Sequence, residues 1–276
     1  MSDKRLALRR DLQLAPREHA LARRGLHLIA DMQQTEVRLT EAELFSFFTR
    51  YRQVMQEIGG IPDAFLEGKT SNPHDGAAFD VNRKLVAFDR ISMNPGYVLD
   101  WVYDRDHHSG EPLVYAREIS AKPLATPDQY YARFNLPRKF WTEPTSETCR
   151  PFLDHLTFEQ TPMGCFQFAM FCMTIRRFYL FWHSNYNDRG YIYTDARRAE
   201  AIGKRLGSIK PRDVELLTSI DVRPRVMIQG SSSQISLFNF VDGRGYSFVH
   251  IFIRHPNSFE RFEEDVVIQT ECTILY

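Results

Sequence analysis

The sequence predicts an α+β fold with a largely antiparallel sheet. The expected strands outnumber the expected helices, and they come in consecutive runs rather than alternating one for one with helices. Four of them follow one another between positions 225 and 274, which predicts a C-terminal β-meander. The aromatic content of 13% points the same way, because Phe and Tyr pack well on the pleated surface of a sheet.

The most apolar stretch, residues 164–188, is expected to form the centre of that sheet. It reads GCFQFAMFCMTIRRFYLFWHSNYND, with the pair Arg176-Arg177 in its middle. This pair leaves no uncharged run of about 18 residues, so the stretch is not predicted to span a membrane. We expect central buried strands at about 165–184, with the arginine pair at the turn between them.

Helices over 40–58 and 196–206 are expected to cover the sheet. In the first, Thr40 and Glu43 have the spacing of a capping box, apolar residues recur every three or four positions, and Gly59-Gly60 ends the pattern. In the second, Asp195 is a suitable N-cap and Gly207 follows the last turn.

The remaining elements follow from local patterns of alternation and turn residues. A DGRG sequence marks a hairpin in the meander, because glycine supplies the positive φ of such turns. The expected strands are 84–90, 97–103, 113–118, 191–194, 225–229, 235–241, 246–254 and 266–274, an imperfect alternation runs over 152–160, and short helices are expected at 127–134 and 211–218.

We expect residues 1–276 to form a single domain, with 1–34 as a helical arm. Five prolines lie between positions 119 and 151, so this connection is the one place where an internal boundary is possible. Phe140 and Trp141 within it favour a segment that packs onto the domain.

Composition narrows the classes of function. There are 35 basic and 35 acidic residues, and this lack of a basic excess argues against a nucleic-acid partner. The four cysteines include no CxxC pair, and no apolar segment of a signal peptide stands near the N-terminus. We therefore expect a soluble, reduced, cytoplasmic protein.

Three polar loops collect the residue types that perform acid–base chemistry. The candidate catalytic residues are His183, Asp188, His107, His108 and Asp104, and the candidate binding residues are Trp182, Asn185, His74 and Asp75. Histidine titrates near neutral pH and a carboxylate can orient it. Their spacing matches no known metal-binding pattern, so no metal set or cofactor is predicted. The other interpretation is that Asn, Asp and Gly stand there because they accept turn geometry.

Two functions remain open. The first is a non-catalytic protein that binds a ligand, a protein partner or a second copy of itself. Its support is the neutral charge and the aromatic strand with Tyr246, Phe248, His250 and Phe252, one face of which needs a cover. The alternative is a metal-assisted hydrolase or other acid/base enzyme, which requires the His/Asp loops to converge. Metal analysis of the purified protein together with a His183→Ala variant distinguishes the two.

Overall fold

The computed structural model describes residues 35–57, 81–105, 109–138, 145–175, 181–182, 189–192, 211–241, 245–254 and 258–269. The predicted arm 1–34 and the predicted helix 196–206 lie outside these ranges. The chain from Thr35 onward forms one unit. The fold class is α+β, and all of its described strand pairings are antiparallel.

The largest sheet contains the predicted meander. Its strands are β1 (Thr35–Arg38), β7 (Arg189–Ile192), β8 (Arg225–Gln229), β9 (Ser232–Val241), β10 (Gly245–Arg254) and β11 (Ser258–Ile268). They run in the order β1-β8-β9-β10-β11, and β7 pairs with the far end of β9. Gly245, with φ of 103°, pairs with Val241, so the predicted hairpin is confirmed. The last strand lies earlier than the predicted 266–274.

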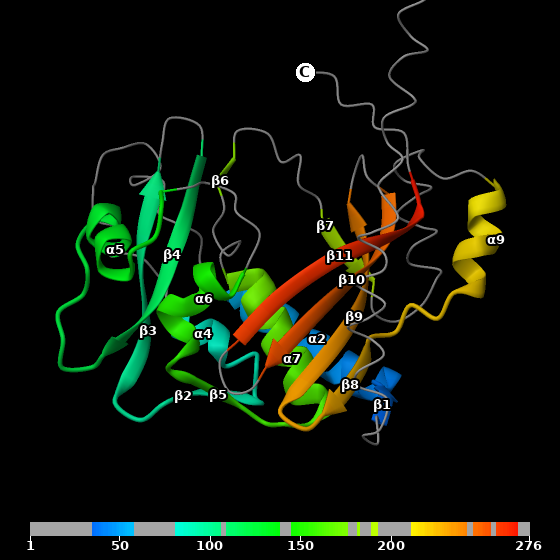
Figure 1. Ribbon diagram of the computed structural model, residues 1–276, viewed down its shortest axis with the longest axis horizontal. Coiled ribbons are helices and arrows are strands. Elements are labelled where there is room, and N and C mark those ends of the chain that lie inside the picture. The colour runs from blue at the N-terminus through cyan, green and yellow to red at the C-terminus, as the bar shows by residue number, and fades with distance from the viewer. Residues whose placement is uncertain are drawn as a thin grey trace, which may run out of the picture. The chain divides into compact units, whose positions relative to one another are not determined.

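The predicted central strands at 165–184 are wrong over most of their length (Figure 1). Pro162–Thr174 is helix α7, and among the described residues of this stretch only Phe181–Trp182 form a strand, β6. Helix α7 contacts β8, β9 and β10 as well as β2 (Ile91–Met93) and β5 (Leu156–Phe158). A helix that is buried on all sides shows no periodic pattern, so its sequence resembles that of a buried strand.

The large sheet has a core face and an outer face. Val249, Ile251 and Ile253 of β10 face the core beside α7. On the outer face, α9 (Pro211–Ser219) places Leu217 in a small second cluster with Phe238 and Tyr246. That cluster buries Tyr246 completely, whereas Phe252 further along the same strand is 39% exposed. Among the described residues, Leu217 of α9 therefore helps to cover the outer face beside Tyr246, and Phe252 toward the other end of the strand stays partly exposed.

A second part of the unit is built on a long hairpin. Strands β3 (Tyr97–Arg105) and β4 (Ser109–Glu118) pair along their length, and β6 adds to the end of β4. Helices α5 (Pro127–Phe134) and α6 (Ser146–Leu153) contact this hairpin. Helix α5 has the bounds that the sequence predicts.

The predicted strand 84–90 is also wrong. Val81–Leu85 is helix α4, and two turns then lead to β2. The Asn82 side chain donates to the Leu99 carbonyl at 2.9 Å and accepts from the Leu99 N–H at 2.9 Å. One side chain thus satisfies backbone groups on β3 that a neighbouring strand would otherwise bond.

Helix α2 (Glu41–Glu57) confirms the predicted helix 40–58, including its capping box. Thr40 and Glu43 bond each other's backbone N–H groups at 2.9 and 3.2 Å. Its Phe47 packs on Phe88 and Phe166 in the main core. Among the described helices, none combines the length and apolar character that crossing a membrane requires.

Candidate functional site

Of the predicted site residues, only Asp104 has a described side chain. It is fully buried on β3, accepts a hydrogen bond from the Tyr131 hydroxyl at 2.7 Å and forms an ion pair with Arg138 at 2.6 Å. These contacts tie the hairpin to α5 and the segment after it. Trp182 is described by its backbone alone, and His74, Asp75, His107, His108, His183, Asn185 and Asp188 lie outside the described residues.

Strand pairing brings the flanks of two predicted loops together. Ser109, which follows the loop with His107 and His108, pairs with Trp182, which precedes His183. The described flanks of two polar segments that are far apart in the sequence therefore lie at the same end of the three-stranded sheet. In the described part of the chain, no three His, Cys, Asp or Glu side chains are grouped so that they could hold a metal. The acid/base use of these loops stays a prediction.

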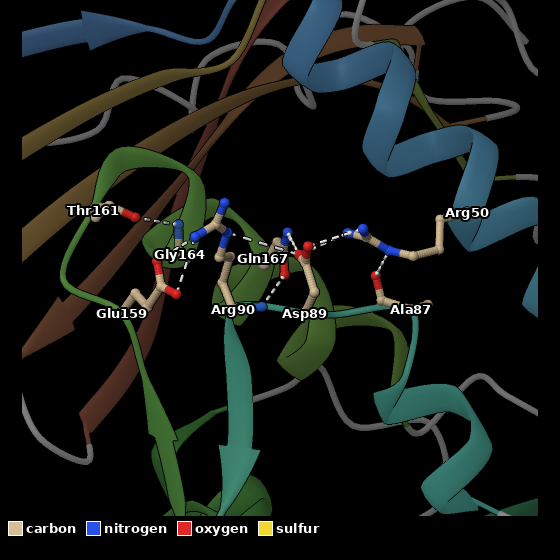
Figure 2. Close-up of polar contacts among 8 residues, drawn as sticks. All are labelled: Arg50, Ala87, Asp89, Arg90, Glu159, Thr161, Gly164 and Gln167. Carbon is tan, nitrogen blue, oxygen red and sulfur yellow. Dashed lines mark hydrogen bonds and ion pairs between the residues drawn. The ribbon is translucent and has the colours of Figure 1, made fainter.

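One polar cleft lies between α2 and α7 (Figure 2). Its volume is about 330 Å³, and it is lined by Ala42, Glu43, Ser46, Phe47, Arg50, Asp89, Arg90, Met163 and Gln167. Arg50 makes a bidentate ion pair with Asp89, at 2.7 and 2.9 Å, and also donates to the Ala87 carbonyl. Arg90 donates to both carboxylate oxygens of Glu159, at 2.8 and 3.0 Å.

The Gln167 side chain joins these two ion pairs. It is 1% exposed, donates to Asp89 at 2.8 Å and accepts from the backbone N–H of Arg90 at 3.0 Å. Both guanidinium groups in this cleft are thus matched by a carboxylate that is held in place (Figure 2). Such an arrangement fixes α2, β2 and α7 to one another, and it leaves little positive charge for a ligand.

A second cleft, which we call the hairpin cleft, differs from the first because three of its charged side chains form no ion pair within the described residues. Its volume is about 520 Å³, and its lining consists of Tyr97, Ala116, Glu118, Arg133, Phe134, Asn135, Arg150, Pro151, Asp154 and His155. Small-molecule sites usually have volumes of about 300–1,000 Å³.

Four chain segments supply these residues. Tyr97 begins β3 and pairs with Glu118 at the end of β4. Helix α5 ends here, and Asn135 caps it in the left-handed conformation, with φ of 51°. Asparagine tolerates that conformation better than most residues do, which lets the chain turn sharply into the cleft wall.

The aromatic wall of the hairpin cleft is held firmly. The rings of Tyr97 and His155 are stacked, with centroids 3.9 Å apart and planes 23° apart. The backbone of His155 donates to Phe152 at 3.1 Å and accepts from Asn94 at 2.8 Å. Both ends of this peptide segment are therefore fixed, and the imidazole keeps its place against the tyrosine.

Three charged side chains of the hairpin cleft form no ion pair within the described residues. Arg133 places its guanidinium 5.8 Å from the Phe134 ring centroid. Arg150 donates to the Phe134 carbonyl, and Glu118 accepts a 3.4 Å hydrogen bond from the Tyr97 hydroxyl. The cleft is lined by two arginines and two carboxylates, Glu118 and Asp154, and the two arginines and Glu118 are not paired with each other.

Sequence reasoning did not find the hairpin cleft. Its residues come from separate segments that only the tertiary fold brings together. The adjacent Asp154 and His155 were the one local signal, and they lie at the end of a helix that was not predicted. No protein-family model matches this sequence, and neither the curated proteins nor the solved structures contain a match to it.

Proposed function

We propose that the protein binds a small zwitterionic molecule in the hairpin cleft and does not transform it. The supporting observation is that Arg133, Arg150 and Glu118 line one cleft without forming ion pairs among the described residues. A carboxylate on the ligand would accept hydrogen bonds from the arginines, and an ammonium group would donate to Glu118. The stacked Tyr97–His155 pair offers an aromatic surface for a flat or apolar part of the ligand.

The contrast with the α2–α7 cleft supports this choice. There Arg50 and Arg90 each already bond a carboxylate at 2.7–3.0 Å, so a ligand would have to displace an existing partner. In the hairpin cleft a ligand would reach Arg133, Arg150 and Glu118 without breaking an ion pair between described residues. The gain in charge-assisted hydrogen bonds is therefore larger at the hairpin cleft.

The test is a thermal-shift screen with free amino acids and other small zwitterions, followed by calorimetric titration of each compound that raises Tm. We expect Arg133→Gln and Glu118→Gln each to weaken binding by about tenfold or more, because each removes a charged partner. Arg83→Gln is the matched control, since Arg83 is exposed on α4 and outside the cleft. A screen without any hit, or hits whose affinities are the same in all three variants, would contradict the proposal.

We also infer a cytosolic location. Cys149, Cys165 and Cys172 are all free and buried, as is usual for proteins in a reducing compartment. Fractionation of cells with an antibody to the protein tests this, and recovery in a secreted or membrane fraction contradicts it.

A further inference from the structure

A row of polar side chains crosses the outer face of the large sheet. Ser236 of β9 stands directly opposite His250 of β10, and its hydroxyl lies 2.9 Å from Nδ1 of that histidine. The other ring nitrogen, Nε2, lies 3.1 Å from Oδ2 of Asp265 on β11. The three side chains come from adjacent strands and form one hydrogen-bonded chain.

The order of these contacts determines the role of each ring nitrogen. A carboxylate beside Nε2 favours the tautomer that carries its proton there, because Asp265 can then accept a hydrogen bond. Nδ1 is left with its lone pair directed at Ser236, so the serine hydroxyl is the donor. The three side chains can take the roles of nucleophile, general base and orienting carboxylate, with the two ring nitrogens interchanged relative to the Ser-His-Asp triad.

Irregular pairing of β10 with β11 occurs beside this row. Asp265 pairs with Phe248, and the register then shifts between Val249 and His250. Residues directly opposite each other share a face, so Asp265 lies on the outer face with Phe248 and reaches His250 diagonally. Bulges of this kind redirect side chains and are frequent next to active sites.

A cation lies at the other end of the row. Arg225 of β8 is the direct cross-strand neighbour of Ser236, and its guanidinium lies 5.8 Å from the Phe248 ring centroid on the same face. Its Nε is buried and has no hydrogen-bond partner among the described residues. A donor without a partner beside the serine could bond an oxyanion that develops there.

We propose that Ser236, His250 and Asp265, with Arg225, form a nucleophilic site that hydrolyses small carboxylic esters. The row is most open at the Asp265 end, since the side chains of His250 and Asp265 are 24% and 79% exposed, whereas Nε of Arg225 is buried. Phe252 is two residues from His250 on the same strand face and is 39% exposed, so an aryl or alkyl group of the ester has an apolar neighbour.

The reaction would proceed in two balanced halves. Ser236 Oγ bonds to the ester carbonyl carbon and passes its proton to Nδ1 of His250, while Arg225 faces the negative carbonyl oxygen. The carbon–oxygen bond to the alcohol then breaks, and the alcohol leaves with the proton from Nδ1. Water next attacks the acyl group and gives its proton to Nδ1, and Ser236 Oγ takes that proton back as the acid departs.

The test combines covalent labelling with ester hydrolysis by the full chain. We expect a fluorophosphonate probe to modify Ser236, as located by mass spectrometry of peptides, and p-nitrophenyl acetate to be hydrolysed. Ser236→Ala should abolish labelling, and His250→Gln should lower the rate by roughly 100-fold or more. Asp265 is a positioning residue, so Asp265→Asn should slow labelling and Asp265→Glu should restore part of it.

Ser232→Ala is the matched control, because Ser232 lies on the same strand and its hydroxyl donates to the Gln229 carbonyl at 3.0 Å. Thermal unfolding of each variant separates loss of chemistry from loss of fold. The proposal is overturned if Ser236 is not modified, if Ser232 is modified as fast, or if folded Ser236→Ala retains the hydrolysis rate. Arg83→Gln should leave labelling unchanged, because Arg83 is exposed on α4 and outside both sites. Labelling needs no ligand in the hairpin cleft, so its outcome is independent of the proposed function.

Discussion

At the scale of single residues, Gly164 is required by a close backbone approach. A Cβ at this position would overlap the carbonyl oxygen of Glu159 and lie 2.9 Å from its carbonyl carbon. The Glu159 backbone cannot easily withdraw, because its N–H donates to the Arg90 carbonyl at 3.0 Å and its side chain pairs with Arg90. The room for a side chain at position 164 is therefore limited by Glu159, whose backbone and side chain are both held by Arg90.

We predict that Gly164→Ala destabilises the protein by about 1–3 kcal/mol, the usual cost of overpacking a fixed site. Alanine favours a helix over glycine by about 1 kcal/mol, but this gain is too small to offset the clash with a backbone oxygen. Urea unfolding measures the change. Gly96→Ala is a comparison with a different cause, because a Cβ there meets nothing within 4 Å, and its cost comes from the φ of 87°, which strains an L side chain. A stabilised Gly164→Ala variant would contradict the assignment.

At the scale of elements, helix α7 is determined by its first residues. Thr161 accepts a hydrogen bond from the Gly164 N–H at 3.1 Å, and Pro162 occupies the first helical position, where a missing N–H does no harm. The rest of the helix supplies apolar surface all round, with Phe166, Phe168 and Phe171 fully buried. The cap specifies where the helix begins, and tertiary burial stabilises it.

Our prediction for this helix concerns the stability that the Thr161 cap contributes. Thr161→Ala should lower the free energy of unfolding by about 1 kcal/mol, because one backbone donor of the first turn loses its acceptor. Thr161→Ser keeps the hydroxyl and should stay within about 0.5 kcal/mol of the native protein. Urea unfolding followed by circular dichroism provides both values. Equal losses in the two variants would show that the threonine methyl group, and not the cap, is what matters.

The same helix shows where prediction from sequence ended. The meander, α2 and α5 were predicted because alternation, capping boxes and turn residues are local signals. Residues 165–174 are apolar except for Gln167 and Thr174, so periodicity could not separate helix from strand, although Thr161-Pro162 marked a helix start. The hairpin cleft could not be predicted from the sequence for another reason. Tyr97, Arg133 and His155 lie close together only because β3, α5 and α6 pack against one another.

At the scale of the whole unit, the large sheet joins the first described strand to a strand near the other end of the chain. Strand β1, from the start of the described unit, pairs with β8 near the other end of the chain. Arg38 at the end of β1 forms an ion pair with Asp221, which lies just before β8. Asp221 also accepts two side-chain hydrogen bonds from Arg223, at 2.8 and 3.0 Å. One carboxylate thus connects segments that are 183 positions apart.

The ionisation of Asp221 makes the contact between the end of β1 and the segment before β8 sensitive to acid. The side-chain hydrogen bond from Arg223, followed by its backbone hydrogen bond and the charges of Arg223 and Arg38, lowers the pKa of Asp221 below its ordinary value of 3.8. Since the pKa is lower in the folded state, folding favours the charged form. The contribution to stability is complete above pH 3.8 and disappears as the pH falls through the folded-state pKa.

We therefore predict that Asp221→Asn is less stable than the native protein at pH 7, and that the difference shrinks as the pH falls below about 4. Urea unfolding of both proteins at a series of pH values between 7 and 2 measures it. Asp128→Asn is the control, because the Asp128 carboxylate is 86% exposed and its 3.6 Å ion pair with Arg138 should contribute little. A difference that stays constant down to pH 2 would mean that Asp221 acts through packing or neutral hydrogen bonds. The closure of β1 onto β8 would then be independent of charge.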